Sequence, residues 1–479
     1  MNRCDGSSRD LYTAPVQHIR RFLPEIGLGA LLLFFACREL GTFPAPWADE
    51  GLFVTVAKMV ASGKGYALPL LHATWYEPYF LNVGPLFILP SALSMAVFGI
   101  SSTAARLPMV FFLIAATALF SLFVKRIDGR HSARLATALL ITLSAYINTG
   151  KPVLGEIPAF VCLLAGLLFL LRPSSWKRNV GSGIFFGFAL MTKITFGIIL
   201  PSLGIAGLFA LWRRQWKEVR SLLIVGLLAI AVELPWRMLE MQHALGGGLM
   251  SELRNFLIGN GETASLHFLS LNPGLLLTLP PLAFGVFFVL GTVGWWHLRK
   301  RIPATVSVTS AAFVLFFAAY YLNGPGWYRL LLPGHLLLLA FVPDGARRLF
   351  GKRMGAIVLV VIIAAQAYWQ WDHRGSSQSL ESGRAAQVLM RTYVNQDLLI
   401  AQTEVFSQLP MNPHWLFLIP NLSFSMPAAF HTVSGMLCSV PILLKVSPED
   451  QRKYRPEQLS TVAGRYVLVR GYPCPYTLP

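Results

Sequence analysis

The chain has 479 residues, is 54% hydrophobic and only 13% charged, and has a mean hydropathy of +0.56. These values exclude an ordinary soluble globular domain and indicate an integral membrane protein. The formal net charge is +18, but the basic residues stand in short clusters between apolar runs. This is the pattern of cytoplasmic loops and argues against a nucleic-acid partner.

In chain order, the apolar runs predict about eleven membrane-spanning helices. The first has no small-residue cleavage signal, so we expect an uncleaved anchor. The run 84–99 contains Pro85 and Pro90. We expect it to be interfacial or re-entrant, because counting it as a span would export several basic clusters. The predicted spans are 24–42, 106–125, 134–149, 157–172, 180–194, 195–211, 220–239, 274–298, 304–322, 329–343 and 353–371.

With the N-terminus inside, this topology places the scattered polar loops together on the outer side of the membrane. A group of that kind indicates a functional site. The segments assigned to the outer side are Asp49–Glu50, 149–158, Lys193, 241–272, 323–329 and everything after Trp371.

Residues 1–371 are therefore predicted to form a transmembrane domain, and residues 372–479 a small extracytoplasmic α+β domain behind a polar linker at 372–380. A helix at 382–393 and strands near 398–401, 415–419 and 466–469 are expected there. Its two cysteines, Cys438 and Cys474, form the one plausible disulfide pair, although two unpaired thiols explain the sequence equally well.

The first candidate site is Asp49–Glu50, two adjacent carboxylates directly after the first apolar run. Ionisable groups at a membrane surface are candidates for function because they are costly unless they face a cavity or a partner. The alternative is local helix stabilisation, with Asp49 as N-cap and Glu50 in the first turn. Glu156, before Pro158, has the same two readings.

Three outer cations are candidates for binding a phosphate. Lys193 lies at the tip of a tight hairpin, where it could equally snorkel to lipid headgroups. Arg329 follows a Gly-Pro-Gly turn, and its guanidinium matches phosphate geometry well. The alternative for Arg329 is interfacial anchoring together with Trp327 and Tyr328. Arg106 is the third outer cation.

These residues lie in a pattern that resembles a known family. The segments Trp47–Glu50, Ala57–Gly63 and Ala104–Pro108 resemble the first outer loop of the GT-C glycosyltransferases, and Gly155-Glu156, Thr192-Lys193 and Tyr328-Arg329 continue the match. The chain is most similar to the protein O-mannosyltransferase and aminoarabinose transferase superfamily, in particular its lipopolysaccharide galacturonosyltransferase-like branch. One departure is at Leu81–Leu86, where aminoarabinose transferases usually have a Lys-Pro-Pro-Leu step.

The resemblance implies an all-α polytopic GT-C membrane fold with interfacial helices in the first outer loop. It implies an inverting glycosyltransferase of the bacterial inner membrane, with its active site on the extracytoplasmic side. A polyprenyl-phosphate-linked hexose or pentose would be the donor, and a hydroxyl of a lipid, glycan or protein the acceptor. No metal-ligand spacing of Cys and His is present, no cofactor is firmly implied, and a divalent cation is compatible with the scheme.

Within this scheme, the expected catalytic residues are Asp49 as general base, with Glu50 and Glu156 orienting the substrates. Arg106, Lys193 and Arg329 would stabilise the charge that develops on the leaving lipid phosphate. The alternative is a transporter or lipid-flipping protein without transferase activity. A transporter should carry charges near the midplane of the membrane, and the main examples here are Glu233 and Arg237.

The predicted topology can be tested by cysteine-accessibility labelling. Single cysteines introduced at the two ends of the 84–99 segment should both react with a membrane-impermeant reagent from the outer side. Opposite accessibility of the two positions would mean that this segment crosses the membrane.

Overall fold

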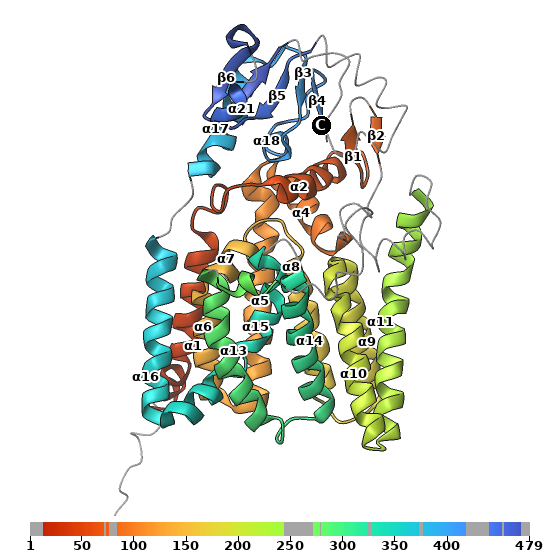
Figure 1. The fold of residues 1–479 in the computed structure, drawn as a ribbon, viewed down its shortest axis with the longest axis vertical. Coiled ribbons are helices and arrows are strands. Elements are labelled where there is room, and N and C mark those ends of the chain that lie inside the picture. The colour runs from red at the N-terminus through yellow and green to blue at the C-terminus, as the bar shows by residue number, and fades with distance from the viewer. Residues whose placement is uncertain are drawn as a thin grey trace, which may run out of the picture.

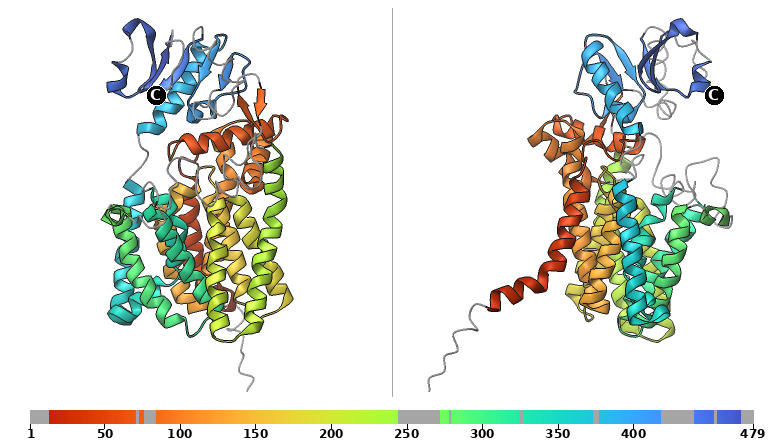
Figure 2. Two further views of the ribbon diagram at one scale, coloured as in Figure 1. Left: turned by 45° about the vertical axis from the view of Figure 1, so that its right-hand side comes forward. Right: turned by 90° about the vertical axis from the view of Figure 1, so that its left-hand side faces the viewer.

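The computed structural model describes residues 13–70, 73–75, 84–243, 272–277, 279–323, 327–372, 377–417, 440–452 and 455–470. Figures 1 and 2 show a long bundle of helices with a small sheet-containing domain at one end. The helices α2 (Ala48–Ala61) and α4 (Pro85–Phe98) lie between the two parts. The predicted fold class, a helical membrane protein with a small C-terminal α+β domain, is confirmed.

The bundle helices follow the predicted apolar runs. Among the described residues, five helices are long and apolar enough to cross a membrane. Further apolar helices are shorter, so the count of about eleven spans stays a prediction. The bundle consists of α1 (Thr13–Cys37), α5 (Ser102–Asp128), α6 (Arg130–Thr142), α7 (Ser144–Gly150), α8 (Glu156–Leu170), α9 (Trp176–Thr192), η1 (Ile194–Ile198), α10 (Ile199–Trp212), α11 (Trp216–His243), η3 (Pro273–Leu277), α13 (Leu279–Leu298), α14 (Ala304–Asn323), η4 (Tyr328–Leu330), α15 (Leu332–Leu338) and α16 (Val342–Asp372).

Local sequence sets where several of these helices begin and bend. The hydroxyl of Ser101 accepts from Ala104 N at the start of α5, and that of Ser175 accepts from Arg178 N at the start of α9. These are N-caps that satisfy an otherwise unpaired amide. Gly351, at φ 79°, bends α16. A left-handed backbone of this kind is accessible to glycine without a steric penalty.

The segment 84–99 does not run through the bundle. Its helix α4 lies beside α2 at the end that carries the C-terminal domain (Figure 1). Phe87 of α4 packs edge-on against Phe53 of α2, with ring centroids 5.7 Å apart. Its other face exposes Leu89, Leu93 and Val97 at four-residue spacing. This apolar stripe is what an interfacial helix requires.

The C-terminal domain combines α17 (Ser377–Thr392), α18 (Thr403–Phe406), α21 (Pro448–Gln451) and η5 (Pro456–Gln458) with a five-stranded sheet of order β4-β3-β5-β7-β6. β3 is parallel to β4 and β5, whereas β7 is antiparallel to β5 and β6. The expected helix and strands occur, and residues 377–380 of the expected linker are helical. The strands are β3 (Leu398–Ile400), β4 (Trp415–Phe417), β5 (Ile442–Lys445), β6 (Leu459–Ala463) and β7 (Tyr466–Val469), and a separate hairpin of β1 (Leu68–Leu70) and β2 (Ala73–Trp75) follows α2.

Close helix contact inside the bundle depends on glycine. A Cβ atom at Gly345 of α16 would lie 1.8 Å from Leu290 O of α13, and one at Gly294 would lie 2.0 Å from Phe341 O. Small residues of this kind let the backbones of membrane helices approach closely.

We expect Gly345→Ala to destabilise the protein by about 1–3 kcal/mol, because the opposing atom belongs to the backbone and cannot rotate away. Thermal unfolding in detergent measures the loss. Gly204→Ala in α10 is the control, because no described atom lies within 4 Å of its Cβ position. Equal melting temperatures for the two variants would contradict the close contact.

Candidate functional site

The two adjacent acids of the first outer loop separate into different environments. α2 begins at Ala48 with Trp47 as its N-cap, so Asp49 and Glu50 both lie in the first turn. The interpretation of Asp49 as N-cap is therefore wrong. Successive residues of a helix point about 100° apart, so the two carboxylates meet different partners.

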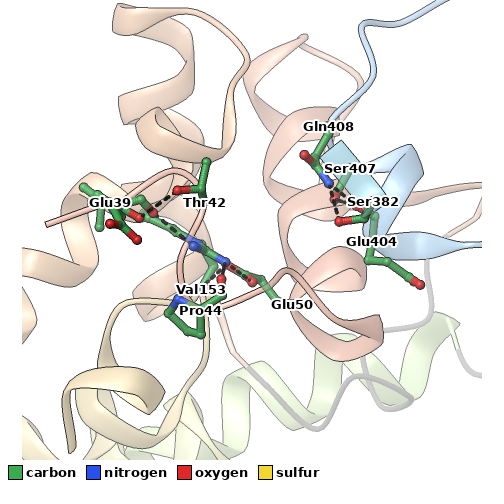
Figure 3. A network of polar contacts seen from close by, with 11 residues as sticks. Glu39, Thr42, Pro44, Glu50, Val153, Ser382, Glu404, Ser407 and Gln408 are labelled. Carbon is green, nitrogen blue, oxygen red and sulfur yellow. Dashed lines mark hydrogen bonds and ion pairs between the residues drawn. The ribbon is translucent and has the colours of Figure 1, made fainter. Parts of the chain in front are cut away.

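Glu50 and Arg106 form a buried two-bond ion pair. Arg106 Nε and Nη2 each lie 2.6 Å from a carboxylate oxygen of Glu50, and the Arg106 side chain is 0% exposed. The guanidinium also donates to Leu40 O at 3.0 Å and Pro44 O at 2.9 Å. Glu50 accepts in addition from Val153 N at 3.1 Å. Figure 3 shows Glu50 beside Pro44 and Val153 in one network of contacts. The pair thus joins α2, α5 and the segments before α2 and α8.

Asp49 points to a different cation. Its Oδ2 lies 2.6 Å from Nη1 of Arg329, which precedes α15. The guanidinium carbon of Arg329 lies 4.3 Å from the ring centroid of Trp47 and 4.8 Å from that of Trp327. Nε and Nη1 of Arg329 make no aligned hydrogen bond within the described residues. Arg329 is therefore held by cation–π contacts with two aromatic rings and by the charge of Asp49, and its enclosed Nε makes no hydrogen bond within the described residues.

Glu156 and Lys193 form the second acid–base contact of this region. Lys193 Nζ donates to Glu156 Oε1 at 2.6 Å, and Glu156 is only 3% exposed. Its other oxygen, Oε2, has no hydrogen-bond partner in the described part of the chain. Tight backbone packing fixes the pair, since a Cβ atom at Gly155 would lie 3.1 Å from Cδ of Lys193.

Tyr320, near the end of α14, lies within electrostatic reach of both Arg329 and Glu156. Both contacts therefore lie near Tyr320. Tyr320 was not among the site residues predicted from the sequence. Trp47 was predicted only as part of a motif, and Trp327 only as an anchor. The aromatic residues beside Asp49 and Arg329 were the available signal.

The remaining sequence predictions fall outside this region. Cys438 and Cys474 lie outside the described residues, so their disulfide stays a prediction. Within the described ranges, no group of three or more His, Cys, Asp or Glu side chains could hold a metal ion. Glu233 and Arg237 of α11 bind each other, with Nε 2.8 Å from Oε1.

The whole architecture has solved counterparts. The structure of ArnT from Cupriavidus metallidurans bound to undecaprenyl phosphate superposes with a TM-score of 0.62 at 13% identity, over 93% of this chain and 97% of that one. The chain has the GT-C fold. The apo oligosaccharyltransferase of Archaeoglobus fulgidus, another protein of this fold, matches with a TM-score of 0.56 at 11% identity, over 89% of this chain and 70% of that one.

Sequence comparison also relates part of the chain to glycosyltransferases. The family model described as dolichyl-phosphate-mannose-protein mannosyltransferase matches residues 82–238. No curated protein matches the chain in sequence. The resemblance to the GT-C glycosyltransferases is confirmed, while its lipopolysaccharide branch stays a prediction.

The Glu50–Arg106 pair generates a stability prediction. Arg106→Met leaves the Glu50 carboxylate buried without a counter-ion, and breaking a buried pair in this way typically costs about 3–5 kcal/mol. Thermal unfolding should show a large loss for Arg106→Met and partial recovery in the double variant Glu50→Leu/Arg106→Met. Arg134→Ala is the control, because its contact with Glu25 is partly exposed and exposed pairs contribute up to about 1 kcal/mol. A loss for Arg106→Met no larger than for the control would contradict the assignment.

Proposed function

We propose that this protein is a membrane glycosyltransferase that moves a sugar from a polyprenyl-phosphate-linked donor to an acceptor hydroxyl on the outer face of the membrane. The observation that carries the proposal is the contact of Asp49 with Arg329. A partly exposed carboxylate lies 2.6 Å from a guanidinium whose Nε makes no hydrogen bond to the described part of the chain. One place thus offers both a proton acceptor and a phosphate ligand.

Arg329 and Lys193 are the proposed ligands of the donor phosphate. Arginine binds phosphate through two parallel N–H bonds, and the edge of Arg329 is suited to this. ArnT, which shares the fold, has been solved with undecaprenyl phosphate. Because this chain has Leu81–Leu86 where the related transferases carry a lysine step, Lys193 and Arg329 would supply the positive charge that the missing lysine provides elsewhere.

The proposed reaction is a direct displacement. The acceptor oxygen forms a bond to the anomeric carbon, the bond from that carbon to the phosphate oxygen breaks, and the polyprenyl phosphate leaves with the electron pair. Asp49 takes the proton of the acceptor hydroxyl. Arg329 and Lys193 stabilise the negative charge on the leaving phosphate. A single displacement inverts the anomeric configuration.

The ion pairs explain how donor binding would free Asp49 to act as a base. A donor phosphate bound to Arg329 competes with Asp49 for the guanidinium and releases the carboxylate for proton transfer. Oε2 of Glu156 is buried and has no partner among the described residues, and it is suited to accept a hydrogen bond from a sugar hydroxyl. The residues that contact the sugar and the acceptor would determine whether the sugar is a hexose or a pentose and which acceptor is used.

For Glu50 and Arg106 we propose a structural role in place of the roles expected from sequence. Arg106 is fully buried, and its Nε, Nη1 and Nη2 all donate to protein oxygens. Both oxygens of Glu50 accept from Arg106. The pair therefore orients the start of α2 and has little left to offer a substrate.

The alternative of a transporter is less well supported. Its main charges within a span, Glu233 and Arg237, form an ion pair with each other one helical turn apart. The transferase proposal accounts for the acids and cations at one end of the bundle. As predicted from the sequence, we propose that this end faces the extracytoplasmic side of a bacterial inner membrane. We also propose that the chain is related to the lipopolysaccharide galacturonosyltransferase-like branch of the superfamily.

Sugar transfer tests the role of Asp49 directly. With a labelled polyprenyl-phosphate sugar in lipid, the wild-type protein should transfer the label, and Asp49→Asn should lower the rate by about 100- to 10,000-fold while folding is unchanged. The control is Asp397→Asn, an exposed acid of the C-terminal domain. Transfer by Asp49→Asn at the wild-type rate, with chemistry limiting, would reject Asp49 as the base.

Arg329→Lys tests the phosphate ligand. Lysine keeps the charge but lacks the planar fork and the stacking between two rings, so we expect weaker donor binding, seen as a higher KM for the lipid-linked sugar. The control is Arg213→Lys, an exposed arginine at the end of α10. An unchanged KM for Arg329→Lys would remove this residue from the donor site.

A further inference from the structure

Lys58, in the third turn of α2, is a lysine enclosed by protein. It is 0% exposed, and its Nζ donates to Phe406 O at 2.9 Å and Leu409 O at 3.0 Å. Nζ also lies 4.2 Å from the centroid of the Phe406 ring. Both carbonyls belong to the C-terminal domain, at the end of α18 and in the turn after it. Lys58 therefore joins the outer-loop helix to a segment almost 350 residues later in the chain.

Two further contacts join the same elements nearer the start of α2. Thr403 Oγ1, at the beginning of α18, donates to Ala48 O at 2.8 Å. A Cβ atom at Gly51 would lie 2.5 Å from the carbonyl carbon of Thr403 and 2.6 Å from Glu404 N. The helices thus touch through their backbones, and only glycine fits at position 51 of this contact.

The three contacts fix how α2 is turned about its axis. Gly51 and Lys58 are seven residues apart and so lie on one face of the helix, against α18. Asp49 is two residues from Gly51, about 200° around the helix, and so faces away from α18. Its partner there is Arg329. A rotation of α2 would move Asp49 and loosen the contacts with α18 together.

α18 is itself held by the core of the C-terminal domain. The Tyr466 hydroxyl of β7 donates to Glu404 Oε1 at 3.0 Å. Burial and then the neighbouring Glu404 carboxylate raise the pKa of Tyr466, so its hydroxyl stays a donor. The Phe406 ring stacks on Phe417 of β4 with centroids 4.5 Å apart. Figure 3 shows the cluster of Glu404, Ser407, Gln408 and Ser382 apart from the Glu50 network.

A buried lysine is a poor means of stabilising this interface. No carboxylate of the described chain pairs with Lys58, and burial lowers the pKa of its ammonium to about 7. An apolar side chain of similar length would avoid the desolvation penalty. The lysine instead fixes the orientation of α2 relative to α18, because its ammonium donates to two specific carbonyl oxygens.

We propose that the C-terminal domain is a positioning element of the active site, acting through α18 on α2, with Lys58 and Thr403 as positioning residues for Asp49. The inference rests on the proposed function, and it gives this domain a role in the transfer step. The domain then affects kcat, because it sets the orientation of the base Asp49. It does not move the phosphate ligands Arg329 and Lys193.

The kinetic test compares Lys58→Met with Lys64→Met, an exposed lysine just after α2. A displacement of about 1 Å in a catalytic group can lower the rate about 100-fold, so we expect Lys58→Met to lose at least about 10-fold in kcat, with a donor KM within about threefold of wild type. Thr403→Val should lower kcat in the same way, and Thr403→Ser, which keeps the hydroxyl, should restore it. Wild-type kcat in folded Lys58→Met and Thr403→Val would overturn the proposal.

Hydrogen exchange provides a readout that does not depend on transfer. Lys58→Met and Thr403→Val should speed amide exchange in α2 relative to wild type and to Lys64→Met, while exchange in α5 is unchanged. Unchanged exchange in α2 would overturn the coupling. If wild-type protein in lipid transfers no sugar while the exchange result is as expected, the proposed function fails and the contact between domain and helix stands. Should Lys58→Met fail to fold, Thr403→Val, which keeps the shape of the side chain and removes only the hydroxyl contacts, decides both readouts.

Discussion

The buried pair of Glu50 and Arg106 is the interaction on which the geometry of the site depends. It gathers the start of α2, the helix α5, the carbonyls of Leu40 and Pro44 and the amide of Val153 around one guanidinium. Asp49 is the residue before Glu50, and Glu156 follows Val153 by three positions. One desolvated ion pair therefore sets the relative positions of the two segments that carry the proposed base and the second acid.

Around this centre, acids and cations are matched one to one. Glu50 pairs with Arg106, Asp49 with Arg329, and Glu156 with Lys193. The pairs differ in solvent exposure. The pair of Glu50 and Arg106 is closed to solvent, whereas Asp49 is about one-third exposed. The proposed structural role fits the fully enclosed pair, and the proposed exchange of partners with a ligand fits the pair whose carboxylate is partly exposed.

The sequence was sufficient for the fold class, the apolar runs and the shared location of the charged residues, because hydropathy and loop charge depend on local composition. It was not sufficient to separate Glu50 from Asp49, or Arg106 from Arg329. Each of these distinctions depends on contacts across 56 to 66 residues or more, as for Arg106 with Glu50 and with Leu40. The contact of α18 with Lys58 is further beyond sequence reasoning, because nothing near Lys58 distinguishes it from an exposed lysine.

The contact of Asp49 with Arg329 also bears on the end of the catalytic cycle. In the proposed mechanism, Arg329 holds the lipid phosphate that remains after sugar transfer, and Asp49 lies beside it. Once Asp49 has passed its proton to solvent, it would compete for the guanidinium and favour departure of the lipid phosphate. Product release limits turnover in many enzymes. An internal anion that returns to its place is a simple means of keeping a charged leaving group from inhibiting the enzyme that produced it.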